Sequence, residues 1–142
     1  MAEKKQYPAE EGLFTWPSNS PQLIGGRCKA CDTYYFPNSS VRHRADCKDR
    51  SATEDVLLGR KGKLDSYTVQ YYPSPPPSPN PEPFAPCAIG WVSLPEGIAI
   101  PGILTGCGPE EIRMHMDVEL VVEKGSRDKE GNDVLIWKWR KI

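Results

Sequence analysis

The residues best suited to chemistry are four metal-type ligands in one short segment. Cys28 and Cys31 have the C-x2-C spacing of a zinc knuckle, and His43 and Cys47 follow after a short excursion. Two thiolates on one tight turn can share a tetrahedral ion, and Cys3His is an accepted set for structural zinc. A second C-x2-C is missing, because Arg50 stands three residues after Cys47. The spacing predicts a closed zinc site, and the alternative is a degenerate knuckle with free thiols.

The segment that carries these ligands, residues 27–53, predicts a small metal-dependent module. It holds three of the five cysteines and one of the two histidines, with few aliphatic residues. Such a segment cannot bury enough apolar surface to fold by itself, so a bound metal explains its order. The chain starts without an apolar signal-peptide region and has no apolar run long enough to span a membrane. We therefore expect a cytoplasmic protein, whose cysteines are ligands or buried thiols rather than disulfides.

The remaining candidate nucleophiles do not form a catalytic pattern. Cys87 and Cys107 lie in or beside predicted strands, where a free cysteine behaves as a small buried hydrophobe. His115 stands between two methionines, with no serine, cysteine or carboxylate spaced to make a triad with it. We therefore interpret His115 as structural or surface-exposed, and we predict no catalytic residues in this chain.

The elements that must position these residues are mostly strands. Segments rich in β-branched and aromatic residues are 54–58, 62–72, 86–94, 98–106, 117–123 and 134–140. Residues 95–97, Pro-Glu-Gly, predict a hairpin turn, and residues 108–112 predict one helical turn. The five segments from 62–72 onward, with a helical turn between the third and fourth, suit a five-stranded OB-type barrel, and a β-sandwich is the competing fold. The predicted organisation is an arm or short helix at 1–26, a metal-binding segment at 27–53 and a barrel domain at 54–142.

Two segments are candidate contacts with a partner. Residues 73–86 hold eight of the 15 prolines and predict a stiff, extended loop of the barrel that contacts a partner or ligand, with idle disorder as the alternative. Residues 13–17 are apolar and either dock on a neighbour or cover their own domain. The interface residues that we predict from these segments are Phe14, Trp16, Pro76, Pro79 and Phe84.

Charge is segregated along a chain whose net charge is only −1. Residues 27–63 contain nine basic and five acidic residues, whereas residues 64–107 contain no Lys or Arg. The second span is typical of an interface or of buried central strands. The first could hold the phosphates of a CoA thioester, bind single-stranded nucleic acid, or be a solvated face. Candidate phosphate ligands are Arg42, Arg44, Arg60, Lys61 and Lys63.

The order of several motifs resembles the DUF35 family. These are C-x2-C, Phe36-Pro37, the GRKGKL run at 59–64, SYTV at 66–69, PCAI at 86–89, LPEG at 94–97, GCGPEE at 106–111 and VELV at 118–121. The resemblance covers roughly residues 13–140, and its order is more specific than any single motif. His43 stands where the family pattern has its third cysteine, and Cys47 lies one residue late for the fourth ligand.

The resemblance implies a mainly β fold, in which an N-terminal rubredoxin-like zinc ribbon precedes a five-stranded OB-fold barrel. It also implies a non-catalytic accessory subunit of an acyl-CoA thiolase complex, which docks on a thiolase-like catalytic subunit, expected as a heterotetramer, and helps to bind CoA thioester. The pattern within the family is most similar to a thiolase subunit of anaerobic toluene degradation. The alternatives are a stand-alone acyl-CoA carrier and a single-stranded nucleic-acid-binding OB module, which the balanced charge disfavours.

Overall fold

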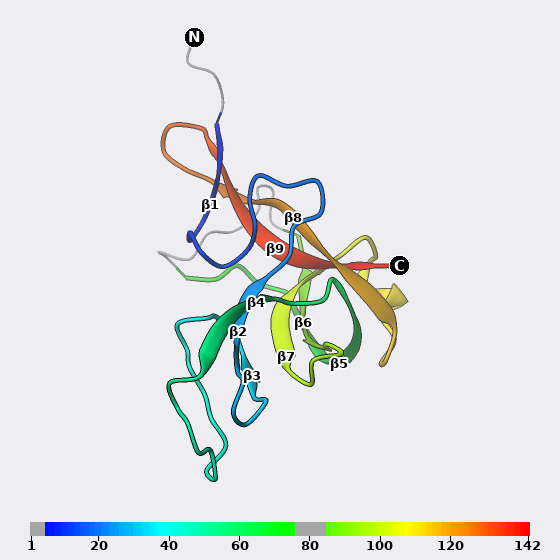
Figure 1. Cartoon of the computed structure of the whole chain (residues 1–142). Coiled ribbons are helices and arrows are strands. Elements are labelled where there is room, and N and C mark those ends of the chain that lie inside the picture. The colour runs from blue at the N-terminus through cyan, green and yellow to red at the C-terminus, as the bar shows by residue number, and fades with distance from the viewer. Residues whose placement is uncertain (1–4, 76–84) are drawn as a thin grey trace.

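The computed structural model describes residues 5–75 and 85–142, which form two β-sheets (Figure 1). The interface candidates Pro76, Pro79 and Phe84 lie outside the described residues. The elements are β1 (Gln6–Pro8), β2 (Ile24–Cys28), β3 (Tyr34–Tyr35), β4 (Thr53–Leu57), β5 (Lys61–Gln70), β6 (Cys87–Ser93), β7 (Ala99–Thr105), the 3-10 turn η1 (Pro109–Glu111), β8 (Asp117–Arg127) and β9 (Asp133–Lys141). The predicted mainly β class is confirmed.

The larger sheet closes on itself. Its strand order is β1-β9-β7-β6-β5-β8, and β8 also pairs with β9. All pairs are antiparallel except β7 with β9 and β1 with β9. The turn predicted at residues 95–97 joins β6 to β7, and Gly97 adopts φ +87°, a conformation that glycine reaches without steric cost. The helical turn predicted at 108–112 is η1.

The core of this sheet follows the alternation of each strand. Leu64, Val92, Ile100 and Leu120 point inward and are at most 1% exposed, and Trp139 fills the interior at 0%. Each such side chain contributes about 1.5–3 kcal/mol when fully buried. A Cβ atom on Gly102 would lie 2.7 Å from the Trp139 ring, so glycine is needed opposite the indole. This core explains why the predicted strand segments correspond closely to β5 through β9.

The smaller sheet has the order β3-β2-β4. β4 falls at the start of the barrel domain in the sequence-based division, but it pairs with β2 along five residues. The close approach of β2 to Tyr35 depends on glycine, because a Cβ on Gly26 would lie 2.1 Å from the Tyr35 ring. We call residues 24–57, which contain this sheet and the ligand loops between its strands, the metal module.

The apolar segment near the N-terminus covers its own chain. Phe14 forms an isolated bridge with Leu23, is 6% exposed and belongs to the core, and Trp16 packs against that core. The Phe14 ring is therefore already buried against its own chain, which agrees with the second interpretation of this segment, that it covers its own domain. The short helix considered for this region is not formed in residues 5–26, where β1 instead pairs in parallel with β9.

Several contacts fix the metal module against the barrel. The Phe36 and Trp137 rings meet edge to face, with centroids 5.4 Å apart. The Glu96 carboxylate, from the β6–β7 turn, accepts the Gly59 amide at 2.8 Å. The Arg60 guanidinium donates to the Pro21 carbonyl at 3.0 Å and to the Leu120 carbonyl at 3.1 Å. The ligand loops are therefore carried on a module that is anchored to the barrel at several points.

Candidate metal centre and adjoining surfaces

The four predicted ligands converge at one end of the small sheet. Cys28 is the last residue of β2, and a tight turn carries Cys31 back toward it. The turn closes through the Asp32 amide, which donates to the Cys28 carbonyl at 2.7 Å, with Asp32 at φ +60°. His43 and Cys47 come from the long loop between β3 and β4.

The ligand atoms have the spacing of a four-coordinate site. The sulfur, sulfur, nitrogen and sulfur atoms of Cys28, Cys31, His43 and Cys47 all lie within 4.8 Å of one another. The Cys47 sulfur lies 3.7 Å from the Cys28 sulfur and 3.7 Å from Nδ1 of His43. A tetrahedral zinc ion with Zn–S bonds of about 2.3 Å needs ligand edges of roughly 3.8 Å. The residues present therefore fit a metal ion, and three thiolates with one imidazole are donors that favour zinc.

The surroundings favour the ionised form of the Cys31 sulfur but not that of the Cys47 sulfur. Hydrogen bonds from the Thr33 hydroxyl, at 3.2 Å, and the Arg44 amide, at 3.5 Å, lower the pKa of the Cys31 thiol to about 5. Burial raises the pKa of the Cys47 thiol instead. A bound cation would favour the thiolate form of both. Four protein ligands leave no position for a substrate water, so such a metal would organise the fold rather than catalyse a reaction.

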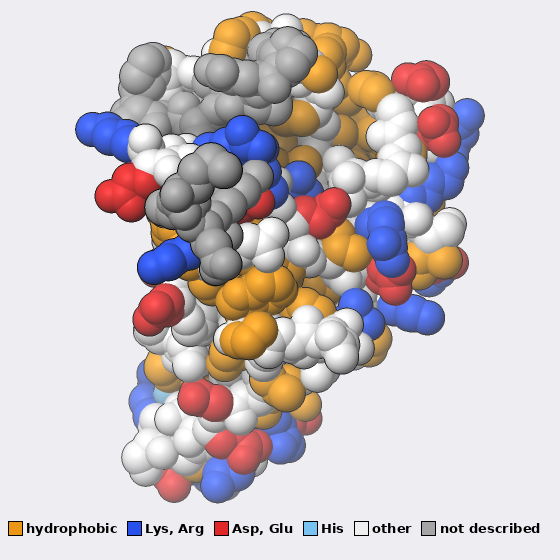
Figure 2. Space-filling model, turned by 90° about the horizontal axis from the view of Figure 1, so that it is seen from above, with side chains coloured by type: hydrophobic (Ala, Val, Ile, Leu, Met, Phe, Trp, Pro, Cys, Tyr) orange, Lys and Arg blue, Asp and Glu red, His pale blue; other side chains and the backbone are white. Residues whose placement is uncertain are grey.

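The five candidate phosphate ligands do not gather in one site. Arg60 is committed to two backbone carbonyls, so we correct its assignment to a structural role. Arg44 pairs with Asp46 at 3.1 Å, and Lys63 pairs with Asp117 at 2.8 Å. Arg42 and Lys61 are exposed, and neither has an ion pair among the described residues. In Figure 2, basic and acidic side chains are intermixed around apolar ones, without a continuous basic field.

A pocket of about 650 Å³ lies where β5 meets the start of β8. Lys61, Lys63 and His115 line it together with the carboxylates of Asp65 and Asp117. These two acids offset the positive charge of the two lysines in the pocket. His115 is exposed, adopts φ +65° and donates its amide to the Leu64 carbonyl at 2.7 Å, which agrees with a structural or surface role.

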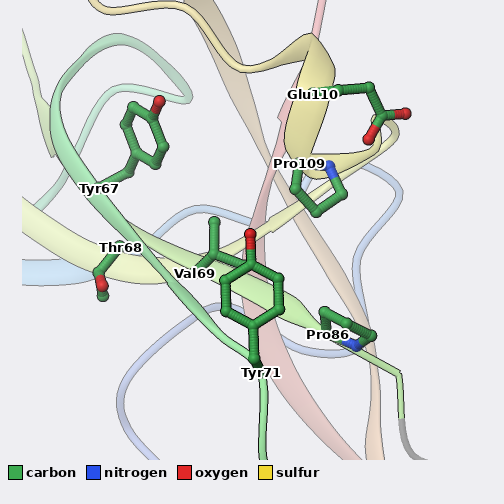
Figure 3. A pocket seen from close by; sticks show the side chains of 7 residues that line it. All are labelled: Tyr67, Thr68, Val69, Tyr71, Pro86, Pro109 and Glu110. Carbon is green, nitrogen blue, oxygen red and sulfur yellow. The ribbon is translucent and has the colours of Figure 1, made fainter.

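A second hollow contains residues that the sequence motifs did not bring together. It has a volume of about 810 Å³ and lies beside β5. Figure 3 shows Tyr67 and Val69 on β5 and Tyr71 just after its end, with Pro109 of η1 on the opposite side. Glu110 of η1 also lines the hollow, but its carboxylate points away from the tyrosines in this view. We call this hollow the tyrosine groove; Thr68 and Pro86 complete its lining. The tyrosines stand out in the sequence, but only the fold places η1 opposite them.

Among the described residues, no helix is both long and apolar enough to cross a membrane.

Comparison with known proteins shows which family has a similar sequence and fold. The family model of the C-terminal OB-fold domain of ChsH2 matches residues 55–123. A DUF35 domain-containing scaffold protein of Methanocaldococcus jannaschii is 34% identical over 80% of this chain and 75% of its own length. The benzoylsuccinyl-CoA thiolase subunit BbsA of Thauera aromatica is 31% identical over 87% of this chain and 78% of its own.

A solved structure gives the same result. A chain of the Ltp2-ChsH2(DUF35) aldolase superposes with a TM-score of 0.63 and 25% identity, covering 84% of each chain. The expected OB-fold domain is confirmed by the match to the ChsH2 domain. The chain with the Cys3His cluster and the closed β-sheet is therefore a member of the DUF35 family.

Proposed function

We propose that this chain is a non-catalytic accessory subunit of an acyl-CoA thiolase complex, which docks on the catalytic chain and helps to hold a CoA thioester. The observation that carries the proposal is the similarity over most of the chain to a thiolase subunit, BbsA, and to a DUF35 scaffold protein. The likeness to a chain of a DUF35–aldolase assembly also supports a catalytic partner.

The cysteine chemistry supports a non-catalytic role. A thiolase needs a thiolate nucleophile and bases for the α-carbon and the CoA thiol. Three cysteines and His43 converge on the metal cluster. Burial raises the pKa of the Cys107 thiol, which keeps it protonated at neutral pH and a poor nucleophile. Among the described residues, neither Cys87 nor Cys107 hydrogen-bonds to a histidine, which is the usual base of a thiol nucleophile.

The bound metal in this proposal is a structural zinc ion held by Cys28, Cys31, His43 and Cys47. Its ligands come from two loops of the metal module, so it would hold those loops together. The module in turn contacts the barrel through Phe36, and the zinc would thereby fix the shape of the surface offered to the catalytic chain.

The contact with CoA would be shared with the partner. Arg42 and Lys61 remain the best candidates to meet phosphate groups, because their charges are not neutralised by an ion pair within the described residues. They lie on different modules, Arg42 on the metal module and Lys61 on β5. A phosphate-binding site that is completed only in the complex with the partner would be consistent with the position of these two residues on different modules.

For the reaction, we propose the thiolysis of (S)-2-benzoylsuccinyl-CoA by CoA, which yields benzoyl-CoA and succinyl-CoA. The support is the 31% identity to BbsA, and the assembly would be a heterotetramer with two copies of each chain. The nucleic-acid alternative is not favoured, because β6 and β7 contain no Lys or Arg to meet phosphates.

Co-expression with a thiolase-type catalytic chain tests the proposal. Size-exclusion chromatography with light scattering should give one species with the mass of two copies of each chain, and calorimetry should detect CoA thioester binding to that species. Separate elution of the two chains would contradict docking. Micromolar binding of the thioester by the isolated chain would favour the stand-alone carrier.

A further inference from the structure

β5 leaves the closed sheet partway along its length. On one edge it pairs with β6 from Lys63 to Gln70. On the other edge it pairs with β8 only from Lys61 to Lys63, and the Leu64 amide and carbonyl complete that ladder with Met116 and His115. A register shift between Leu64 and Ser66 then turns the strand away. Residues 66–70 therefore form a strand whose second edge has no backbone partner within the described residues.

An open edge of this kind invites pairing with another chain. Alternate N–H and C=O groups of an antiparallel strand point away from its partner, so half of those in residues 66–70 face outward. Proteins usually protect such edges with lysines, prolines or covering segments. Residues 66–70 read Ser-Tyr-Thr-Val-Gln and contain no charge and no proline. The sequence of this edge favours strand formation and offers no block to it.

The tyrosine groove lies against the same edge. Tyr67 and Val69 lie on β5 and Tyr71 directly follows it, at alternate positions, so their side chains share one face, as Figure 3 shows. Tyr67 is 41% exposed and Tyr71 is 67% exposed. Exposed aromatic side chains beside an open edge can pack against the alternate side chains of an added strand, which is how strand addition gains specificity.

We propose that an extended segment of the catalytic partner chain adds as a strand to the open edge of β5 at residues 66–70, with alternate side chains in the tyrosine groove. This inference rests on the proposed function and names the surface that it uses. The outward amides and carbonyls supply main-chain hydrogen bonds, and the two tyrosines supply apolar contact.

Charge indicates the chemistry of that segment. Glu110 is exposed at the groove, and its carboxylate has no ion pair among the described residues. Its neighbour Glu111 is instead paired with Lys141 at 3.7 Å. Residues 64–107 contain no Lys or Arg that could neutralise Glu110 from the facing strands. The partner segment should therefore carry apolar side chains at alternate positions and a Lys or Arg that reaches Glu110.

Hydrogen exchange on the co-expressed complex tests the main-chain part of the inference. The outward-facing amides of residues 66–70 should exchange fast in the isolated chain and at least about tenfold slower in the complex with the thiolase-type chain, whereas the amides that bond to β6 should exchange slowly in both. A complex without slowing at these residues would overturn the inference while leaving the proposed function intact. Slow exchange of the outward-facing amides already in the isolated chain would also overturn it, because that edge would then be occupied by this chain itself.

Matched variants test the side-chain part. Replacing both tyrosines, Tyr67→Ser with Tyr71→Ser, should weaken association with the catalytic chain by about tenfold or more. Trp91→Ser is the control, because Trp91 is a comparably exposed aromatic on β6 whose register opposite Ser66 places it on the other face of the hairpin. Glu110→Lys should also weaken association, and Glu123→Lys on β8 should not.

These variants also distinguish failure of this inference from failure of the proposed function. A Trp91→Ser variant that weakens association more than the double tyrosine variant would place the interface on the opposite face and overturn the inference. Failure of the wild-type chains to associate at all would contradict the proposed function, and the inference would fall with it. Circular dichroism should show unchanged folding in each variant, since the replaced side chains are exposed.

Discussion

Phe36 and Trp137 meet edge to face across the junction of the metal module and the barrel, with ring planes at 88° and centroids 5.4 Å apart. Phe36 follows β3 in the small sheet, and Trp137 lies in β9 of the closed sheet. The Trp137 indole N–H also donates to the Pro101 carbonyl at 2.9 Å, which fixes the ring that Phe36 contacts. The pair therefore helps to hold the metal module in a fixed position against the barrel.

A double-mutant cycle on this pair should show a direct interaction. We expect Phe36→Leu and Trp137→Leu each to lower the free energy of unfolding, with a coupling energy of about 0.5–1.5 kcal/mol between them. Urea unfolding of the two single variants and the double variant measures this coupling. Strictly additive effects would mean that the two rings stabilise the chain independently.

Removal of the metal should loosen the metal module first. Purified chain should contain about one zinc per chain, and Cys47→Ser should lose most of it. Hydrogen exchange in residues 24–57 should then rise at least about tenfold, while the strands around Trp139 stay protected. Cys107→Ser is the matched control, because Cys107 lies outside the cluster and the variant should keep its zinc. A zinc-free wild-type chain with a well-protected module would contradict the assignment.

The order of the ligands, the strand segments and the turns could be predicted from the sequence because each depends on local patterns. The C-x2-C turn has its own spacing, and the segments that form β5 to β9 are rich in β-branched and aromatic residues. The segment 54–58 was predicted as a strand and corresponds to β4, whereas β1, β2 and β3 were not predicted. β2 contains Gly25 and Gly26, which disfavour strands in isolation but are required where Tyr35 crosses them.

The functional surface was less predictable because it depends on which distant residues meet. A run such as Arg60, Lys61 and Lys63 looks uniform in sequence, yet the fold uses Arg60 as a backbone clamp and pairs Lys63 with Asp117. The burial of Phe14 and the placement of η1 opposite Tyr67 and Tyr71 likewise come from long-range packing.

The two backbone hydrogen bonds of Arg60 predict that its removal lowers the free energy of unfolding much more than removal of the neighbouring Lys61. Arg60→Ala removes two charge-assisted hydrogen bonds and leaves the Pro21 and Leu120 carbonyls without this donor, so it should cost about 2–3 kcal/mol of unfolding free energy. Lys61→Ala should cost less than about 0.5 kcal/mol, because its side chain is exposed. Chemical unfolding of both variants checks this difference, and equal costs would argue against the clamp.

Low pH should weaken the contact of β1 with the rest of the chain, because it protonates the Asp128 carboxylate that Tyr7 of β1 bonds to. The Tyr7 hydroxyl donates to Asp128 at 2.7 Å, and this bond, with further ones from Asn132 and Glu130, lowers the pKa of Asp128. A carboxyl whose folded pKa is depressed stabilises the fold above its unfolded pKa, and the stabilisation is lost as the pH falls through the folded value.

The expected melting temperature therefore drops as the pH falls below roughly 4, the ordinary range of aspartate. Asp128→Ala should lower the melting temperature at pH 7 and remove part of its fall between pH 5 and pH 3. Thermal unfolding at these three pH values measures both effects. An Asp128→Ala variant with the pH dependence of the wild-type chain would show that other carboxylates dominate.

The most direct test of the accessory role is a titration of activity. Purified catalytic chain is mixed with increasing amounts of this chain, and the CoA-dependent cleavage of the β-keto acyl thioester is followed at each ratio. We predict that cleavage is low with either chain alone and rises to a plateau at one copy of this chain per catalytic chain. Full activity of the catalytic chain alone, unchanged when this chain is added, would contradict the account.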